Sequence, residues 1–117
     1  MRPVQADIQL TLPAAVDFEA GDAAYIDGAS GEFAKAGTYY GLIAKKQRAG
    51  LGATAIRIGI VDGLDVSGLS YGAPVFTSAT AGEVADTTAA GQSQIGFVVP
   101  GYGSKPADKL VYIEGEV

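Results

Sequence analysis

Glycine and proline recur along this chain at intervals that leave no room for a long amphipathic helix. The 117 residues include 17 Gly and 5 Pro, which separate brief apolar runs. Brief apolar runs bounded by such residues are typical of β-strands joined by turns. We therefore predict an all-β protein with a small barrel-like or sandwich β domain, because closing the sheet in either way limits its exposed edges.

Nine segments have the composition of strands. The first has the clearest pattern, because Val4, Ile8 and Leu10 belong to a set of apolar residues that alternate with polar ones over residues 4–12. A period of two places alternate side chains on one face of a strand. The predicted strands are residues 4–12, 23–27, 32–34, 39–45, 54–61, 74–77, 83–85, 94–99 and 109–114.

Two parts of the chain are similar to each other. The segments that begin at Gly21 and Gly72 share an apolar residue followed by an aromatic one, and both continue to Gly-Glu-apolar-Ala, at an offset of 51 residues. Further along, Gly41 aligns with Gly96 at an offset of 55 residues. This similarity indicates a diverged internal repeat of β-hairpin modules. Each module is too small to bury its own apolar face, so we expect the two to share one core.

The repeat suggests how the chain is organised. Residues 1–15 stand outside it as an N-terminal strand or arm, and residues 16–117 form a β domain of two pseudo-repeats, about 16–66 and 67–117. The N-terminal segment has two interpretations. It is either an ordinary strand whose apolar residues join the core, or an arm that adds to the edge of another subunit and places its apolar side chains in pockets there.

The composition lacks the side chains that most catalytic and metal-binding sites use. The chain has neither Cys nor His, which excludes disulfides, thiolate nucleophiles and the commonest ligands of transition metals. Its net charge of -5 argues against a nucleic-acid partner. No signal-peptide core is present, and the apolar stretch 95–99 is far shorter than the ~20 residues that span a bilayer. We therefore expect no enzymatic activity, no cofactor and no membrane partner.

Acidic residues near the first predicted hairpin could supply oxygen atoms to a cation. The spacing of Asp22, Asp27, Ser30 and Glu32 fits no complete calcium loop, and a hairpin turn is the favoured interpretation. Glu32 and Glu83 occupy equivalent positions of the repeat and could form a catalytic carboxylate pair. Turn geometry explains their recurrence more simply.

A short basic segment is one candidate site for a partner. Lys45, Lys46 and Arg48 form the only local concentration of positive charge in this acidic chain. They lack the Gly-Lys-Ser/Thr sequence of a phosphate-binding loop. Contact with an acidic surface of a partner is the function that this segment favours.

Tyrosines beside glycines are further candidates. Tyr71 and Tyr102 lie in or near predicted loops, as do Tyr39 and Tyr40. Exposed tyrosines anchor protein interfaces and stack on sugars, but tyrosine also packs at the rim of a barrel core with its hydroxyl group in water. The sequence leaves these interpretations open.

The order of motifs in the second half of the chain is distinctive. The motifs are Gly-Ala-Pro-Val-Phe-Thr at 72–77, Ala-Gly-Glu-Val at 81–84, Gln-Ile-Gly-Phe-Val-Val at 94–99 and Leu-Val-Tyr-Ile-Glu-Gly at 110–115. In this order they resemble the small capsid decoration, or cement, proteins of tailed bacteriophages. The earlier segments 21–25 and 40–44 fit the front half of that family, so the resemblance covers about residues 16–117.

The resemblance implies a structural virion protein without catalytic activity. Such a protein is made in the cytoplasm of the host bacterium, binds the major capsid protein on the outer surface of the assembled head, and forms homotrimers there. It stabilises the head by mass action, because it binds the assembled shell and not the free subunits. The alternative is a carbohydrate- or receptor-binding β module of a surface structure, with the loop tyrosines and Asp27 as its site. A hydrolase that uses Glu32 and Glu83 comes third.

Overall fold

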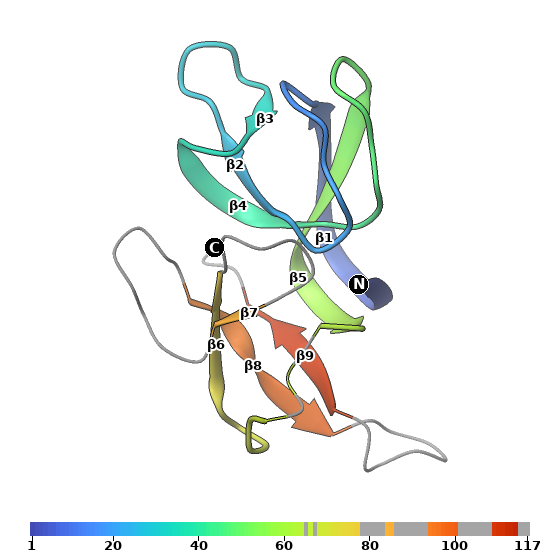
Figure 1. Cartoon of the computed structure of the whole chain (residues 1–117), viewed down its shortest axis with the longest axis vertical. Helices are drawn as coiled ribbons and strands as arrows, with labels where there is room; N and C mark the ends of the chain where they lie inside the picture. The colour runs from blue at the N-terminus through green and yellow to red at the C-terminus, as the bar shows by residue number, and fades with distance from the viewer. Residues whose placement is uncertain (65, 67, 78–83, 86–93, 101–108, 115–117) are drawn as a thin grey trace.

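The structure is a computed structural model that describes residues 1–64, 66, 68–77, 84–85, 94–100 and 109–114 (Figure 1). Within these ranges the regular structure consists of strands, and no helix that could cross a membrane is found. The strands lie at the nine predicted places. They are β1 (Arg2–Pro13), β2 (Ala23–Ile26), β3 (Phe33–Ala34), β4 (Thr38–Ile43), β5 (Gly52–Asp62), β6 (Pro74–Thr77), β7 (Val84–Ala85), β8 (Gln94–Pro100) and β9 (Lys109–Ile113).

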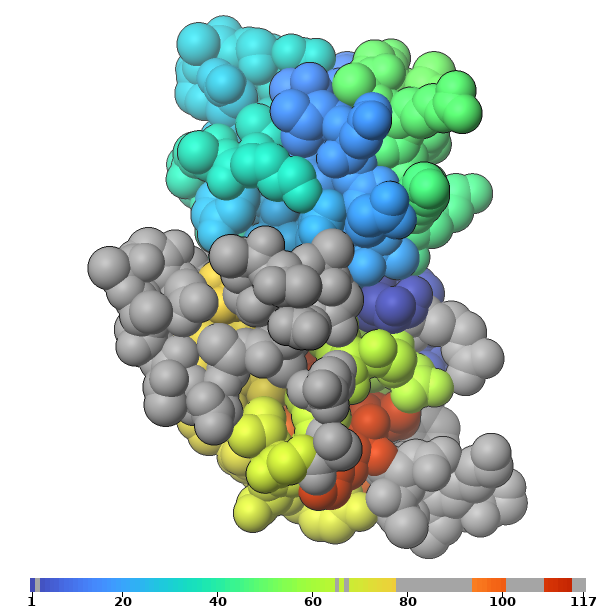
Figure 2. Space-filling view, in the orientation of Figure 1, coloured from blue at the N-terminus to red at the C-terminus, as the bar shows by residue number. Residues whose placement is uncertain are grey.

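These strands form one curled antiparallel sheet, which confirms the prediction of an all-β, barrel-like domain. The strand order is β3-β2-β4-β5-β9-β8-β6-β7, and β1 pairs with β5 outside this path. The molecule is elongated, with extents of 42 × 30 × 25 Å (Figure 2). We call β3, β2 and β4 the upper half and β9, β8, β6 and β7 the lower half, as they stand in Figure 1.

Strand β5 connects the two halves. Residues 55–56 of β5 pair with β4, whereas residues 59–61 pair with β9. On its other side β5 pairs with β1 from residue 52 to residue 62. The long strand β5 therefore pairs with strands of both halves and joins them into one sheet.

The two halves have the same strand pairing at the offsets read from the sequence. In each half the pairing of the first strand with the third is interrupted by one register shift, at equivalent positions. This is the register that two copies of one module would have, although their common origin stays a prediction. The equivalent pairs are Tyr25–Ala34 with Phe76–Ala85, and Ala24–Gly41 with Val75–Gly96.

The buried apolar residues of the described chain form two clusters rather than the single core expected, although the lower cluster contains residues of both predicted repeats. The upper cluster contains Ala55 and Ile43, whereas the lower cluster takes their neighbours Ile56 and Leu42. Adjacent residues of a strand project to opposite faces. Strands β4 and β5 therefore supply one cluster on each face. The upper cluster is completed by Ala14, Phe18, Ala24, Phe33 and Ala53, and the lower by Val61, Leu64, Val66, Val75, Ile95, Val98, Val111 and Ile113.

Two buried glycines permit close approach between strands. A Cβ atom at Gly41 would overlap with the backbone carbonyl group of Ile56, and one at Gly96 would overlap with that of Tyr112. Because the obstacle is backbone, it cannot turn away as a flexible side chain would. The Gly in the Ile-Gly-Phe-Val motif at 95–98 is thus required by packing.

Replacement of Gly96 tests this packing argument. We expect Gly96→Ala to lower the free energy of unfolding by about 1–3 kcal/mol, the range typical of overpacking. Gly28→Ala is the matched control, because a Cβ atom there has no neighbour within 4 Å, and it should change stability by less than about 0.5 kcal/mol. Urea unfolding of both variants measures the difference, and equal stabilities would contradict the argument.

Candidate functional site

Strand β1 is more exposed than a core strand would be. Its backbone pairs with β5, yet every residue from 3 to 11 is exposed. Its large apolar side chains include Val4 (42% exposed), Ile8 (43%) and Leu10 (36%). The interpretation of β1 as a core strand is therefore wrong, since among its alternating apolar residues only Leu12 packs against a core cluster.

Irregular pairing explains why the alternating pattern does not produce one buried face. Three register shifts interrupt the β1–β5 ladder, at Val4, at Asp7 and opposite Arg57. Each extra residue changes the face to which the following side chains project. From Ile8 to the end of β1 the strand itself contains no extra residue. This last stretch is the regular part of the strand, and it carries the exposed Ile8 and Leu10.

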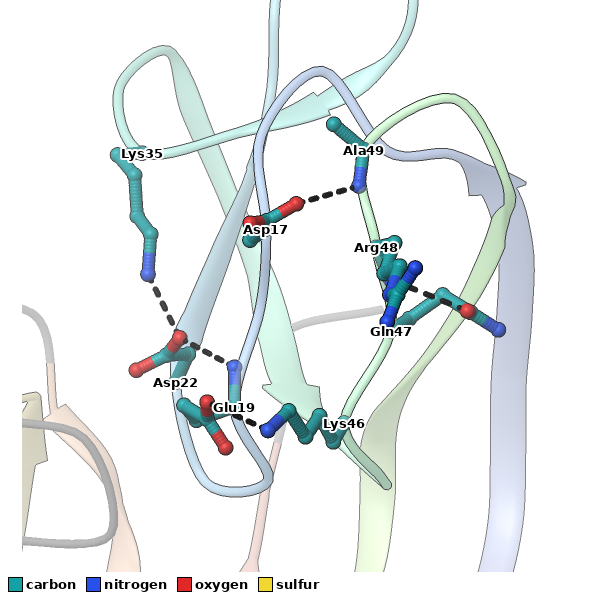
Figure 3. A network of polar contacts seen from close by, with 8 residues as sticks. All are labelled: Asp17, Glu19, Asp22, Lys35, Lys46, Gln47, Arg48 and Ala49. Atoms are coloured by element: carbon teal, nitrogen blue, oxygen red, sulfur yellow. Dashed lines mark hydrogen bonds and ion pairs between the residues drawn. The ribbon is translucent and has the colours of Figure 1, made fainter.

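The basic segment lies in the connection between β4 and β5 (Figure 3). Lys45, Lys46 and Arg48 are all exposed, as a partner-binding segment requires. Two carboxylates from an earlier part of the chain flank them. Glu19 Oε1 lies 3.6 Å from Lys46 Nζ, and Asp17 Oδ1 accepts a hydrogen bond of 2.8 Å from a backbone N–H group of this connection. The segment is therefore less strongly positive than its sequence suggests.

Backbone hydrogen bonds bring these two segments together. The N–H group of Phe18 donates to the carbonyl oxygen of Gln47 at 2.8 Å, and the N–H group of Gln47 donates back at 2.9 Å. Sequence reasoning missed the acidic flank because nothing in the local pattern near residue 18 indicates a partner almost 30 residues away. Only the fold places the carboxylate of Glu19 beside the amino group of Lys46.

A partly buried ion pair holds the acidic segment against the upper half. Asp22 is buried, and its Oδ2 atom accepts hydrogen bonds from the N–H group of Glu19 at 2.8 Å and from Lys35 Nζ at 2.7 Å. Lys35 Nζ also lies 4.7 Å from the ring centroid of Phe18. Asp22 therefore acts as an acceptor that closes a turn, and its negative charge is paired with a lysine.

The loop at residues 27–31 is a turn stabilised by its own side chains. Asp27 Oδ1 accepts hydrogen bonds from the N–H groups of Ala29 at 2.7 Å and Ser30 at 3.2 Å, which lowers the pKa of this carboxyl group. The N–H group of Asp27 donates to the carbonyl oxygen of Glu32 at 2.9 Å. These contacts are those of a hairpin turn. Glu83, the proposed counterpart of Glu32, lies outside the described residues.

The tyrosines occupy different environments. Tyr40 packs against the upper cluster and Tyr39 against the lower one. Burial raises the pKa of Tyr39, whose hydroxyl group has no hydrogen-bond partner within the described part of the chain. Tyr71 is 50% exposed, with Lys109 Nζ at 5.6 Å from its ring centroid. Tyr71 is thus a half-exposed ring beside a lysine, whereas Tyr102 lies outside the described residues.

The structure does not gather the candidate residues into one site. The basic segment lies in the connection between β4 and β5, whereas Tyr71 lies in the connection between β5 and β6. Strand β1 runs beside β5 between these regions. Among the residues that the structure covers, no cluster of three or more acidic side chains is placed to hold a metal ion. The candidate residues are therefore spread over separate parts of the described chain.

Comparison with known proteins assigns no family. No protein-family model matches the chain, and no curated protein matches it. A function is therefore proposed from the exposed surface of β1, together with the resemblance described from the motifs at 72–115.

Removal of the buried carboxylate tests the role of the acidic segment. We expect Asp22→Ala to lower the free energy of unfolding by about 1.5–3 kcal/mol, the range for hydrogen bonds to charged groups. Asp7→Ala is the control, because Asp7 is exposed and its carboxylate accepts hydrogen bonds from the exposed side chain of Gln5. Its effect should stay below about 0.5 kcal/mol. If chemical denaturation gives the same stability for both variants, the contacts of the Asp22 carboxylate do not hold the turn.

Proposed function

We propose that this chain is a structural virion protein that decorates the outer surface of a tailed-phage capsid and stabilises the assembled head. The observation that carries the proposal is β1, a twelve-residue strand with exposed apolar side chains outside both core clusters. The motif order of residues 72–115 supports the choice of a capsid as the partner. The major capsid protein is then the molecule that β1 contacts, and the virion surface is where the protein resides.

The contact that β1 makes is limited by its irregularities. Register shifts at Val4 and Asp7, together with Pro3, disfavour a continuous ladder with a strand of another protein. The regular stretch from Ile8 to Leu12 has no such obstacle on β1. We therefore assign this stretch as the part of β1 that binds, through its backbone edge and through the side chains of Ile8 and Leu10.

A modest binding free energy for each copy is enough to stabilise the assembled shell. Full burial of an Ile or Leu side chain contributes about 1.5–3 kcal/mol, and Ile8 and Leu10 have only part of their surface left to bury. A ligand that binds only the assembled shell stabilises it by RT ln(1 + [L]/Kd) at each site. Because a shell offers many equivalent sites, weak contacts add to a large effect. Trimers on the shell, with three strands β1 per assembly, would strengthen attachment further through multivalency.

The basic segment is the second proposed contact with the capsid. Lys45 and Arg48 are exposed, but the carboxylate of Glu19 lies 3.6 Å from the amino group of Lys46. Charge of this kind contributes more to the rate and orientation of docking than to affinity. We therefore expect high salt to slow association while leaving the apolar contact of β1 in place.

Substitution in β1 tests the proposal. Purified protein is added to phage heads that lack it, and binding is measured for Leu10→Lys and for Val16→Lys. The two side chains are matched in exposure, at 36% and 37%, but only Leu10 lies in β1. Leu10→Lys should bind at least about tenfold more weakly, which corresponds to about 1.4 kcal/mol, and Val16→Lys should bind like the original protein.

Other outcomes would count against the proposal. If the original protein does not bind heads at all, the capsid role is wrong. If both variants bind like the original, β1 is not the contact. Binding to an array of glycans, lost on Tyr71→Ala and kept in Leu10→Lys, would instead favour the carbohydrate-binding alternative. Thermal unfolding of each variant shows whether the domain is still folded.

A further inference from the structure

The N-terminal segment, residues 1–13, is attached to the rest of the molecule mainly through one edge of β1. The main contacts of β1 are with β5, and every residue from 3 to 11 is exposed (Figure 1). Near its two ends the segment reaches the cores, where Met1 packs against the lower cluster and Leu12 against the upper one. Both side chains are only partly buried. The segment therefore gains little from apolar burial, which is the dominant stabilising term in folding.

The backbone ladder between β1 and β5 is also irregular. Three register shifts interrupt it, and Pro3 and Pro13 have no N–H group to donate. The ladder between β8 and β9, by contrast, includes residues 96–100 of β8 without a shift. Val98 and Val111 of that ladder are buried in the lower cluster. Strands β8 and β9 thus have the regular pairing and the packing that β1 lacks.

The attachment of the chain changes after Pro13. Ala14 is buried, and its N–H group donates to the carbonyl oxygen of Leu51 at 2.9 Å. The carbonyl oxygen of Ala14 accepts a hydrogen bond of 2.8 Å from the N–H group of Gly50. From Ala14 onward the backbone is therefore fixed to the upper half, so the weakly attached segment ends at Pro13.

We propose that residues 1–13 form a detachable strap, in which β1 leaves and rejoins β5 while the rest of the sheet stays folded. Segments with few buried apolar contacts open at a lower free energy than the whole domain. The closed strap covers the edge of β5 over residues 52–62. The open strap leaves unpaired N–H and C=O groups on that edge, to which an extended strand can bind.

The strap is thus a reversible cover of a strand-binding edge. It is a property of the protein in solution and does not depend on the capsid role.

One residue of β5 makes the closed strap sensitive to a small change. A Cβ atom at Gly59 would overlap with the carbonyl oxygen of Gln5, and the three atoms nearest to it all belong to Gln5 and Ala6 of the strap. A methyl group at this position therefore pushes against the backbone of the strap and not against either core cluster. If the strap detaches as a unit, its opening relieves the overlap and both halves stay folded.

Hydrogen exchange of the original protein, followed by NMR, tests the proposal. The amides of β1 that bond to β5 should have protection factors at least about tenfold lower than the protected amides of β8 and β9. Their exchange should also depend less on added urea, because local opening exposes less surface than global unfolding. Equal protection and equal urea dependence in β1, β8 and β9 would overturn the proposal, because the strap would then open only with the whole domain.

Gly59→Ala provides a second readout, with Gly96→Ala as the matched variant. Both add one methyl group against a backbone carbonyl, but the obstacle is Gln5 of the strap in the first and Tyr112 of β9 in the second. Gly59→Ala should accelerate exchange in the strap by a factor at least about tenfold larger than in β8 and β9. Gly96→Ala should accelerate exchange in β8 and β9 at least as much as in the strap. Equal acceleration of the strap and the lower half by Gly59→Ala would contradict the proposal.

A disulfide that closes the strap tests it in the opposite direction. Thr11 and Thr54 are directly paired, with their Oγ1 atoms 2.6 Å apart. The chain contains no Cys, so the double variant Thr11→Cys, Thr54→Cys has a single pair of thiols to oxidise. Oxidation should slow exchange in the strap at least about tenfold relative to the reduced form of the same protein, and slow it less in β8 and β9. Unchanged exchange in the strap, or equal slowing in all three strands, would show that β1 does not detach by itself.

Discussion

The whole fold depends on the pairing of β5 with three other strands. One edge of β5 pairs with β4 over residues 55–56 and with β9 over residues 59–61, and the other edge pairs with β1. Alternation along the strand then directs Ala55 to the upper cluster and Ile56 to the lower one. Each half alone has few strands and a small core, a size at which isolated sheets are marginal. Because β5 belongs to both halves, the packing of one half also stabilises the other.

This arrangement leaves β1 in an unusual position. Strand β1 pairs with β5 alone, outside the main order of strands, and its pairing does not require that another element cover either of its faces. Residues 3–11 of β1 are accordingly exposed. The other sheet ends, β3 and β7, contain only two residues each. Short edges are a common protection against unwanted pairing. The long β1 is therefore the exception among the described edges, and its bulges and Pro3 restrict which part of it another protein can use.

Local patterns predicted the strands well because turn residues and apolar runs act within a few residues. The nine strands lie where glycine, proline and short apolar runs place them. Burial was not predictable for β1, because it depends on what packs over a strand and because extra residues at Val4 and Asp7 break the period. The ion pair of Lys35 with Asp22 and the pairing of Phe18 with Gln47 were missed for a related reason. Both contacts join residues that only the folded chain brings together.

Electron microscopy of decorated heads tests the central claim most directly. Phage heads that lack the protein are imaged with and without the purified chain, and the fold is fitted into the added density. The account predicts density on the outer surface, grouped in threes, with the stretch of β1 from Ile8 to Leu12 against the capsid protein and its exposed apolar side chains covered. Heads without added density, or a fitted molecule whose β1 faces solvent while another surface meets the shell, would contradict it.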